Sequence, residues 1–338
     1  MKVALFTKPH ALGVTTKPLR SLQPGEVLVR VDACGVCGTD VHIVEGTSRS
    51  TPPVVLGHEY AGVVEDAASN ESRAMVGRRV AVDPNISCGT CAFCRKGLVH
   101  LCENLRALGV DIDGGMAEYC IAPAGQLYPV PEGMSREASA FIEPVSCAIH
   151  GIDRANVKEG DTVIIVGAGT IGLLMLQLAR IAGAGRTIVL EPLGDKRRIA
   201  SQLGADVLID PLEGDPASAV HDAAPGGADV VIECVGKAET IRLAVDLARR
   251  GGTVEFFGVS PAGESIPIEP NRVYFRELTI IGSYINPRTF DRSIGLLASG
   301  KVRIDPFRID TFPLDGVHEA LRYQREGKTI KSIILPHS

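Results

Sequence analysis

One short segment constrains the fold of this chain more than any other. An apolar run, Thr162–Val166, leads into Gly167-Ala168-Gly169-Thr170-Ile171-Gly172, and the following residues, Gly172–Ala182, have the length and leucine spacing of a helix. In such a strand–turn–helix unit the first glycine permits a tight turn, the second lets the backbone approach a pyrophosphate, and the third lets the helix pack on the strand. Free amides at the start of the helix would then hold the phosphates of a dinucleotide.

Strands and helices alternate beyond this segment. Predicted strands are Thr187–Leu190, Val207–Ile209, Val230–Cys234 and Thr253–Phe257, and predicted helices are Lys196–Leu203, Ala217–Ala223 and Thr240–Arg249. Strict alternation predicts an α/β domain with a doubly wound parallel sheet, here residues 150–286. The first part of the chain instead has short apolar runs between Gly, Pro and Asp, which predicts a β-rich domain, and Ile333–Leu335 resembles a terminal strand. We therefore expect a second domain formed by residues 1–149 and 287–338, since 338 residues exceed one ordinary core.

An acidic residue, Glu191, follows the second strand about 20 residues beyond the glycine pattern. A carboxylate there accepts hydrogen bonds from both ribose hydroxyls and repels a 2′-phosphate, so NAD is favoured over NADP. Lys196, Arg197 and Arg198 lie close by in the sequence. They could accept a phosphate, which keeps NADP as the alternative, or form a solvated helix face; Lys196 could also reach the ribose beside Glu191.

Four cysteines lie in one turn-rich segment, residues 88–102, with the spacing Cys-x₂-Cys-x₂-Cys-x₇-Cys: Cys88, Cys91, Cys94 and Cys102. Four thiolates so placed can surround a single zinc ion at about 2.3 Å, as in a closed structural site. Two disulfides, or thiols buried in an apolar core, are the alternatives. The chain starts without the apolar stretch of a signal peptide, so we expect a reduced cytoplasm in which the thiols bind metal.

Composition argues against two classes of partner. Charged residues make up 22% of the chain, with mixed signs and a net charge of −5, whereas a nucleic-acid binder needs a concentrated basic surface. No apolar run reaches the about 18 residues of a membrane span. We expect neither nucleic acid nor membrane as a partner.

A second group of metal-ligand residues occurs in three separate motifs. Gly35–His42 contains Cys37, Gly57–Tyr60 contains His58 and Glu59, and Phe141–Pro144 contains Glu143. Taken singly, each residue could be structural, because a lone cysteine is usually core and a lone histidine usually just hydrogen-bonded. Together they form a mixed thiolate, imidazole and carboxylate set with room for water or substrate, as a catalytic zinc site requires.

With these motifs the chain resembles the zinc-containing medium-chain dehydrogenases, in the branch of the sorbitol (polyol) and threonine dehydrogenases. The resemblance covers essentially the whole length and also rests on Gly114–Tyr119 and the Glu143-Pro144 pair. It implies a GroES-like β-rich catalytic domain, a Rossmann coenzyme domain, and an active site in the cleft between them. Relatives are homodimers or homotetramers that commonly join edge strands, for which we nominate Thr279–Tyr284.

The resemblance also implies roles for single residues. Cys37 and His58 would bind the catalytic zinc ion with Glu59 as a further ligand, while Glu143 would bind the metal or its water. Thr39 and His42 match the hydroxyl and imidazole of a proton relay; the alternatives are a helix cap for Thr39 and a surface position for His42. Coenzyme contacts are implied, beside the three glycines, at Thr170, Ile171, Glu191, Lys196, Val235, Gly258, Val259, Tyr284 and Ile285.

The implied reaction is hydride transfer from a secondary alcohol to NAD, with one catalytic and one structural zinc ion per chain. The stretch Gly282–Pro287 lacks both the arginine of polyol dehydrogenases and the glycine–arginine pattern of threonine dehydrogenases. Asn286 would offer a neutral amide, which suits an uncharged polyol, sugar or cyclitol better than a zwitterion. A threonine-type amino-alcohol is the alternative substrate, and a non-catalytic nucleotide sensor or a zinc-free quinone-type reductase are alternative functions.

Overall fold

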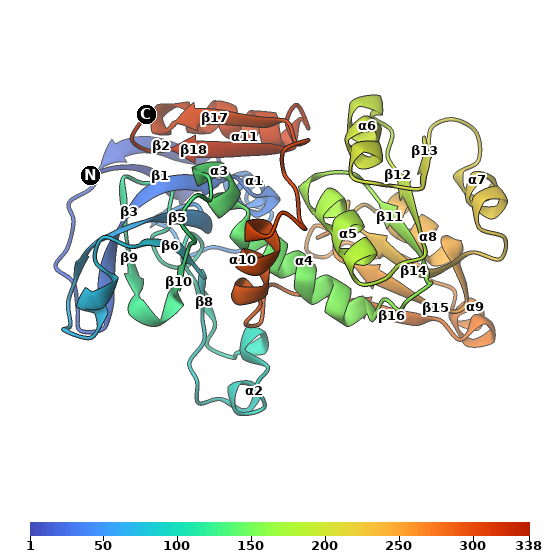
Figure 1. Ribbon diagram of the computed structural model, residues 1–338, viewed down its shortest axis with the longest axis horizontal. Helices are drawn as coiled ribbons and strands as arrows, with labels where there is room; N and C mark the ends of the chain where they lie inside the picture. The colour runs from blue at the N-terminus through green and yellow to red at the C-terminus, as the bar shows by residue number, and fades with distance from the viewer. The chain divides into compact units, whose positions relative to one another are not determined.

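The computed structural model describes all 338 residues, and they form two compact units. Unit 1 comprises Met1–Ser146, Asn286–Ala298 and Arg308–Ser338, and unit 2 comprises Cys147–Ile285 and Ser299–Phe307. Figure 1 labels the elements of both units. The end of the chain therefore belongs to the same unit as its beginning.

Unit 1 is built on a seven-stranded, mostly antiparallel sheet with the order β10-β6-β5-β3-β18-β17, in which β9 also pairs with β3. Side chains of the central strand β3 (Glu26–Gly35) alternate between buried and half-buried over most of its length, as expected when one face covers a core. The remaining strands are β5 (Glu59–Ala67), β6 (Arg79–Val82), β9 (Tyr119–Pro123), β10 (Leu127–Pro129), β17 (Ile309–Pro313) and β18 (Lys331–Leu335). Ile333–Leu335, predicted as a terminal strand, lies in β18.

Smaller elements complete unit 1. A three-stranded sheet consists of β1 (Lys2–Lys8), β2 (Ala11–Thr16) and β4 (Val54–Val55), and a short β7–β8 pair (Asn85–Ile86 and Arg106–Ala107) closes the cysteine segment. That segment projects from the sheet in Figure 1. The helices are α1 (Gly38–Glu45), α2 (Ala92–Arg95), α3 (Arg136–Ala140), α10 (Phe290–Ala298) and α11 (Val317–Arg325), with 3₁₀ turns η1 (Ser72–Met75), η2 (Val99–Leu101), η3 (Ala124–Gln126) and η4 (Leu314–Gly316), while α4 (Ile142–Ala155) continues into unit 2.

Unit 2 contains a six-stranded, fully parallel sheet with the order β13-β12-β11-β14-β15-β16. This order confirms the predicted doubly wound Rossmann domain. The strands are β11 (Thr162–Val166), β12 (Arg186–Leu190), β13 (Val207–Ile209), β14 (Ala228–Glu233), β15 (Ala248–Phe256) and β16 (Thr279–Gly282), and the helices are α5 (Thr170–Ile181), α6 (Gly194–Gln202), α7 (Pro216–Ala223), α8 (Ala238–Leu247) and α9 (Pro270–Arg276). Val163, Ile164 and Ile165 are fully buried, as the continuous apolar run of a central parallel strand predicts.

The largest difference from the predicted boundaries lies between α8 and β15, where the strand predicted to start at Thr253 starts five residues earlier. The helix expected over Thr240–Arg249 ends at Leu247, and β15 already begins at Ala248. Ala248 has extended backbone angles and pairs with Ala228 of β14, so sheet pairing overrides the helical pattern there.

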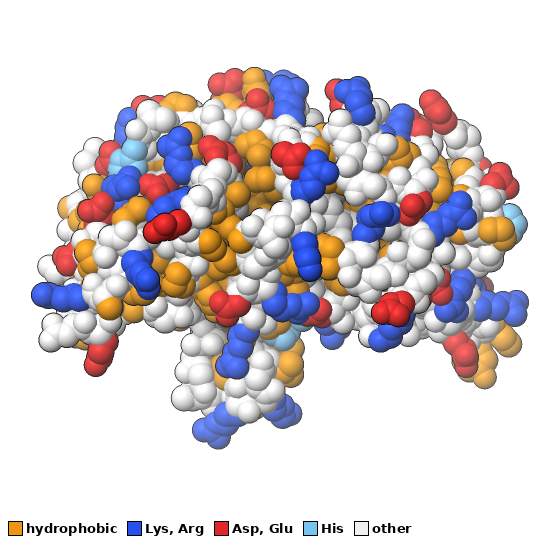
Figure 2. Space-filling view, in the orientation of Figure 1, with side chains coloured by type: hydrophobic (Ala, Val, Ile, Leu, Met, Phe, Trp, Pro, Cys, Tyr) orange, Lys and Arg blue, Asp and Glu red, His pale blue; other side chains and the backbone are white.

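On the face shown in Figure 2, basic and acidic side chains are interspersed. None of the helices combines the length and the apolar character that crossing a bilayer requires.

Candidate zinc and coenzyme sites

The fold brings Cys37, His58 and Glu59 together. Strand β3 ends at Gly35, two residues before Cys37, and β5 begins at Glu59, directly after His58. Gly35 pairs with Glu59 in the antiparallel β3–β5 ladder, so the end of one strand meets the start of the other. One ligand atom from each of Cys37, His58 and Glu59 lies within 4.8 Å of the other two. Three residues predicted as ligands therefore form one cluster.

A buried carboxylate, Asp40, supports this cluster. Its Oδ2 accepts a hydrogen bond of 2.9 Å from the Cys37 N–H, which closes the first turn of α1, and its Oδ1 lies 3.5 Å from Nδ1 of His58. A carboxylate at one ring nitrogen leaves the other free for a metal. Burial lowers the pKa of His58, but the negative charges of Asp40 and Cys37 raise it more, so that this pKa lies well above its usual value. The cluster therefore favours positive charge.

Thr39 and His42 lie three residues apart on α1, on the same side of the helix. The Thr39 hydroxyl is 3.5 Å from the Cys37 sulfur, and Nδ1 of His42 is 3.2 Å from the Thr47 hydroxyl. The alternative role of Thr39 as a helix cap is wrong, because Cys37 is the N-cap and Asp40 completes the capping box. The relay roles of both residues stay predictions.

Glu143 lies at the second position of α4, where it is largely buried. It does not belong to the group of donor atoms that lie within 4.8 Å of one another. Its charge nevertheless acts on the same buried ammonium, Lys331, as the charges of Glu59 and Cys37. Glu143 is therefore electrostatically coupled to the cluster, and its role as a ligand stays a prediction.

The four cysteines of the projecting segment form a second cluster. Their Sγ atoms all lie within 4.8 Å of one another, and all nine cysteines of the chain are free thiols rather than disulfides. Backbone N–H groups of Cys91 and Cys88 lie 3.4 and 3.2 Å from the sulfurs of Cys88 and Cys102. Hydrogen bonds from Thr90, backbone first and hydroxyl second, lower the pKa of Cys88 to about 5. Burial raises the pKa of Cys94 to about 11, so the four thiols differ in acidity, and their arrangement fits a closed zinc site.

The glycine pattern opens α5 as predicted. Gly167 has a φ of 95°, and a Cβ there would lie 2.6 Å from a methyl group of Val235. A Cβ on Gly172 would overlap the carbonyl oxygen of Gly167, so helix and turn pack too closely for any side chain. Gly169, the N-cap of α5, has nothing within 4 Å of its Cβ position. The open side of the turn fits the approach of a pyrophosphate.

Glu191 directly follows β12, and its carboxylate is held against the glycine turn. Oε2 accepts a 2.8 Å hydrogen bond from the Ala168 N–H, and Oε1 accepts one of 2.9 Å from the Leu193 N–H. Two of the three neighbouring basic residues are paired: Arg197 with Asp210 at 2.7 Å and Arg198 with Asp195 at 2.6 Å. Lys196 lies half-buried in the first turn of α6.

The other predicted coenzyme residues also follow strands of the parallel sheet. The carboxyl ends of parallel strands meet at one edge of a sheet, where open α/β folds bind their ligands. Three apolar side chains there are unusually exposed, at 39% for Val235, 75% for Val259 and 50% for Tyr284. Val235 follows β14, Gly258 and Val259 follow β15, and Tyr284 and Ile285 follow β16.

Comparisons with known proteins agree with this geometry. The model of the alcohol dehydrogenase GroES-like domain matches residues 23–132, and that of the zinc-binding dehydrogenases matches residues 170–299. D-arabinitol dehydrogenase 1 of Uromyces fabae is 32% identical over 100% of this chain and 97% of its own length. The chain belongs to the zinc-containing medium-chain alcohol dehydrogenase family, in its polyol and threonine dehydrogenase branch.

Two further proteins are similar to this chain over nearly their whole length. L-threonine 3-dehydrogenase of Pyrococcus abyssi is 36% identical over 92% of this chain and 91% of its own. The crystal structure of a zinc-binding dehydrogenase from Sinorhizobium meliloti 1021, bound to NADP, superposes with a TM-score of 0.94 at 42% identity and covers 99% of both chains. The expected family and fold, a GroES-like and a Rossmann domain, are confirmed. Membership implies an alcohol dehydrogenase that uses zinc and a nicotinamide coenzyme.

Asn286 does not have the role expected for it in this dehydrogenase. Its side chain is buried, its Nδ2 donates to Asp83 at 3.2 Å, and its Oδ1 accepts from Asn85 at 2.6 Å. Both ends of the amide are thus engaged within unit 1. Asn286 offers no free amide to a substrate. Instead, it links the segment Asn286–Ala298, where the chain re-enters unit 1, to Asp83 and Asn85 at the base of the cysteine segment.

One residue near the predicted zinc ligands was not predicted. Lys331, the first residue of β18, is 2% exposed and forms an ion pair with Glu59. The available sequence signal was a single lysine at the start of an otherwise apolar terminal run. That signal does not indicate the partner, because Glu59 is far away along the chain.

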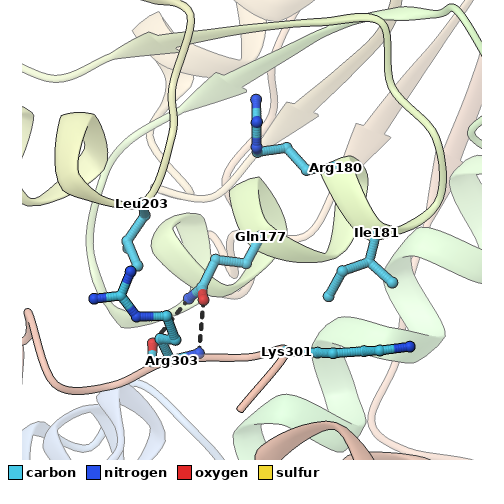
Figure 3. Close-up of a pocket in the computed structure, with 6 residues that line it drawn as sticks. All are labelled: Gln177, Arg180, Ile181, Leu203, Lys301 and Arg303. Carbon is cyan, nitrogen blue, oxygen red and sulfur yellow. Dashed lines mark hydrogen bonds between the residues drawn. The ribbon is translucent and has the colours of Figure 1, made fainter. Parts of the chain in front are cut away.

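The cavity shown in Figure 3 is not part of the predicted zinc and coenzyme sites. It has a volume of about 240 Å³ and is lined by Gln177, Arg180, Ile181, Leu203, Lys301 and Arg303 of unit 2. The Gln177 amide binds the backbone of Arg303 through bonds of 2.7 and 3.1 Å, while the basic side chains of Arg180, Lys301 and Arg303 point in different directions in Figure 3. None of the predicted site residues lines this cavity, and its cations do not converge on a common ligand.

Proposed function

We propose that this enzyme oxidises a secondary alcohol group of a polyol, sugar or cyclitol to a ketone, with zinc and NAD. The observation that carries the proposal is the cluster of Cys37, His58 and Glu59, whose donor atoms lie within 4.8 Å of one another beside the buried Asp40. We assign the catalytic domain to residues 1–149 and 287–338 and the coenzyme domain to residues 150–286. We also propose a cytoplasmic homodimer or homotetramer that uses the sheet edge at β16.

The donor set fits a catalytic zinc ion. One half-buried sulfur, one buried imidazole and one buried carboxyl group lie together, which is the mixed set that leaves a coordination position open. A zinc ion bound there would supply Lewis acidity that lowers the pKa of a substrate hydroxyl. Cys37 and His58 would hold it, with Glu59 or Glu143 as a further ligand, and the four cysteines of the projecting segment would hold a structural zinc ion.

Thr39 and His42 would carry the proton away from the substrate. The Thr39 hydroxyl lies next to the Cys37 sulfur, so it can accept a proton at the metal cluster and pass one on. His42 is half-buried on the same helix, and an imidazole can both accept and donate a proton, which suits exchange with solvent.

The position of Glu191 supports NAD. Its carboxylate is fixed beside the glycine turn, where it would accept ribose hydroxyls and repel a 2′-phosphate. Arg197 and Arg198 are already paired with acidic side chains, so they are poorly placed to bind a phosphate. Because one similar structure contains NADP, the assignment is tested by comparing kcat/KM for NAD with kcat/KM for NADP. A clear preference for NADP would overturn it.

The choice of substrate is supported by the sequence and by one relative. The glycine–arginine pattern of threonine dehydrogenases is missing from Gly282–Pro287, and one of the relatives that cover the whole chain is named for D-arabinitol. Threonine is the second candidate, because several similar enzymes are named for it. A panel of pentitols, hexitols, cyclitols, sugars and threonine, with NADH formation as the readout, tests the proposal. Turnover of threonine without turnover of any polyol, sugar or cyclitol would reverse the order.

A further inference from the structure

Lys331 is an unusual residue for the interior of a sheet. Only 2% of it is exposed, and it starts a strand whose other residues are almost all buried. A buried ammonium is stable only when a counter-charge compensates for lost hydration. Glu59, which is 2% exposed as well, provides that charge through its Oε2 atom.

The sheet leaves a passage for this ion pair. Strand β3 lies between β5, which carries Glu59, and β18, which carries Lys331. Gly35 of β3 pairs with Glu59 on one side and with Ile333 on the other. A Cβ at position 35 would overlap the Glu59 carboxylate and lie 2.8 Å from Cε of Lys331. Because residue 35 has no side chain, the lysine can cross β3 to reach Glu59.

The ammonium faces more than one negative group of the proposed zinc site. Burial lowers the pKa of Lys331, but the charge of Glu59, followed by those of Cys37 and Glu143, raises it more. The net effect is a raised pKa. The ion pair with the Glu59 carboxylate places the ammonium beside the residues that we assign to zinc.

We propose that Lys331 is a positioning residue that holds Glu59 back from full coordination of the zinc ion, which keeps one coordination position available to the substrate. The inference rests on the proposed zinc site at Cys37 and His58. A carboxylate whose charge is shared with an ammonium is a weaker metal ligand than a free one. Without Lys331 the buried carboxylate of Glu59 loses its ion-pair partner, and the metal becomes its counter-charge, so that it would become a permanent ligand.

Replacement of the lysine in the zinc-loaded enzyme tests this role. We expect K331M to release the Cys37-site zinc to a chelator about tenfold more slowly than the parent and to lose about tenfold in kcat, the scale of outer-shell effects. K331R, which keeps the charge, should behave like the parent. The matched control is K328M, since Lys328 is an exposed lysine on the same approach to β18, paired with Glu326 at 2.6 Å.

Cobalt substitution gives a readout that a purely structural role would not move. We expect the visible d–d absorption of the cobalt enzyme to change in K331M, because an additional carboxylate enters the coordination sphere, and to keep its parental form in K331R. The double variant E59Q/K331M carries neither buried charge and guards against misfolding of K331M. It should lack the spectral change, because the carboxylate that causes it is gone.

Several outcomes would overturn the proposal: zinc release from K331M at the parental rate or faster, an unchanged cobalt spectrum in K331M, or the same spectral change in E59Q/K331M. These results leave the proposed function intact. If the C37S variant instead has the same zinc content as the parent, the proposed catalytic site itself is wrong. Failure of the Lys331 proposal and failure of the proposed function are therefore distinguishable.

Discussion

The two cysteine-containing clusters of unit 1 are built in different ways. In the projecting segment, all four sulfurs come from one stretch of chain, and backbone N–H groups of the same stretch lie close to the sulfurs of Cys88 and Cys102. In the other cluster, Cys37, His58 and Glu59 come from the facing ends of two strands, with Asp40 and Lys331 behind them. A local loop can close four equal ligands around an ion, whereas a sheet can place unequal ligands and leave one position open.

The largest effect should separate the two clusters by function. We expect C37S to lower NAD-linked alcohol oxidation by at least about a thousandfold, because several kcal/mol of transition-state stabilisation depend on the metal there. The zinc content should fall from two ions per chain to one, in line with the two clusters. Metal analysis and steady-state kinetics measure both quantities. Retention of full activity by C37S would remove the distinction between the clusters.

The reciprocal change should affect stability first. C91S removes one of four sulfurs from the projecting segment, and we expect a loss of at least about 2 kcal/mol in unfolding free energy, because a structural metal contributes to folding directly. Denaturant unfolding and limited proteolysis within residues 88–102 measure it. Any remaining folded enzyme should keep its zinc at Cys37. If C91S lost activity as severely as C37S without unfolding, the cysteine segment would have a catalytic role.

Asp40 distinguishes the Cys37 cluster from the four-cysteine cluster, because its carboxylate lies beside a predicted ligand, His58. D40N keeps the shape of the side chain but removes the charge beside His58, and we expect zinc affinity or kcat/KM to fall about 10- to 100-fold. D32N is the control, since Asp32 is an ion-paired carboxylate elsewhere in β3. Equal effects of D40N and D32N would mean that any lost charge in this sheet matters.

The smallest effect concerns the base of the projecting segment. Burial raises the pKa of Asp83 to about 6, and this residue binds Asn85 and Asn286. The folded state thus binds the proton more tightly than the unfolded state, so stability falls as pH rises from about 4 to about 6 and stays at its lower value above. The full difference is at most about 3 kcal/mol.

D83N should remove this pH dependence, because the amide can accept the same hydrogen bonds but does not ionise. Urea unfolding at pH 4.5 and at pH 7 measures the free energy of unfolding on either side of most of the Asp83 titration. We expect the parent to lose stability relative to D83N between these values. A parallel response of both proteins would show that Asp83 does not titrate in this range.

Patterns formed by residues close together in the sequence predicted much of the structure. The glycine turn before α5, the alternation of strands and helices in unit 2 and the clustering of Cys88, Cys91, Cys94 and Cys102 all depend on neighbours within a few residues or on one repeated unit. The boundary between α8 and β15 was missed because pairing of Ala248 with Ala228 outweighs local helix preference.

What the sequence by itself determined is therefore the family, the two fold classes and the residues that form both clusters. Only the tertiary structure decided that Asn286 is buried against Asp83 and Asn85 and that Lys331 reaches Glu59 across Gly35. The physical reason is that burial and charge pairing depend on which distant strands become neighbours in a sheet. Lys331 and Glu59 are separated by most of the chain, and the sheet order β5-β3-β18 brings them together.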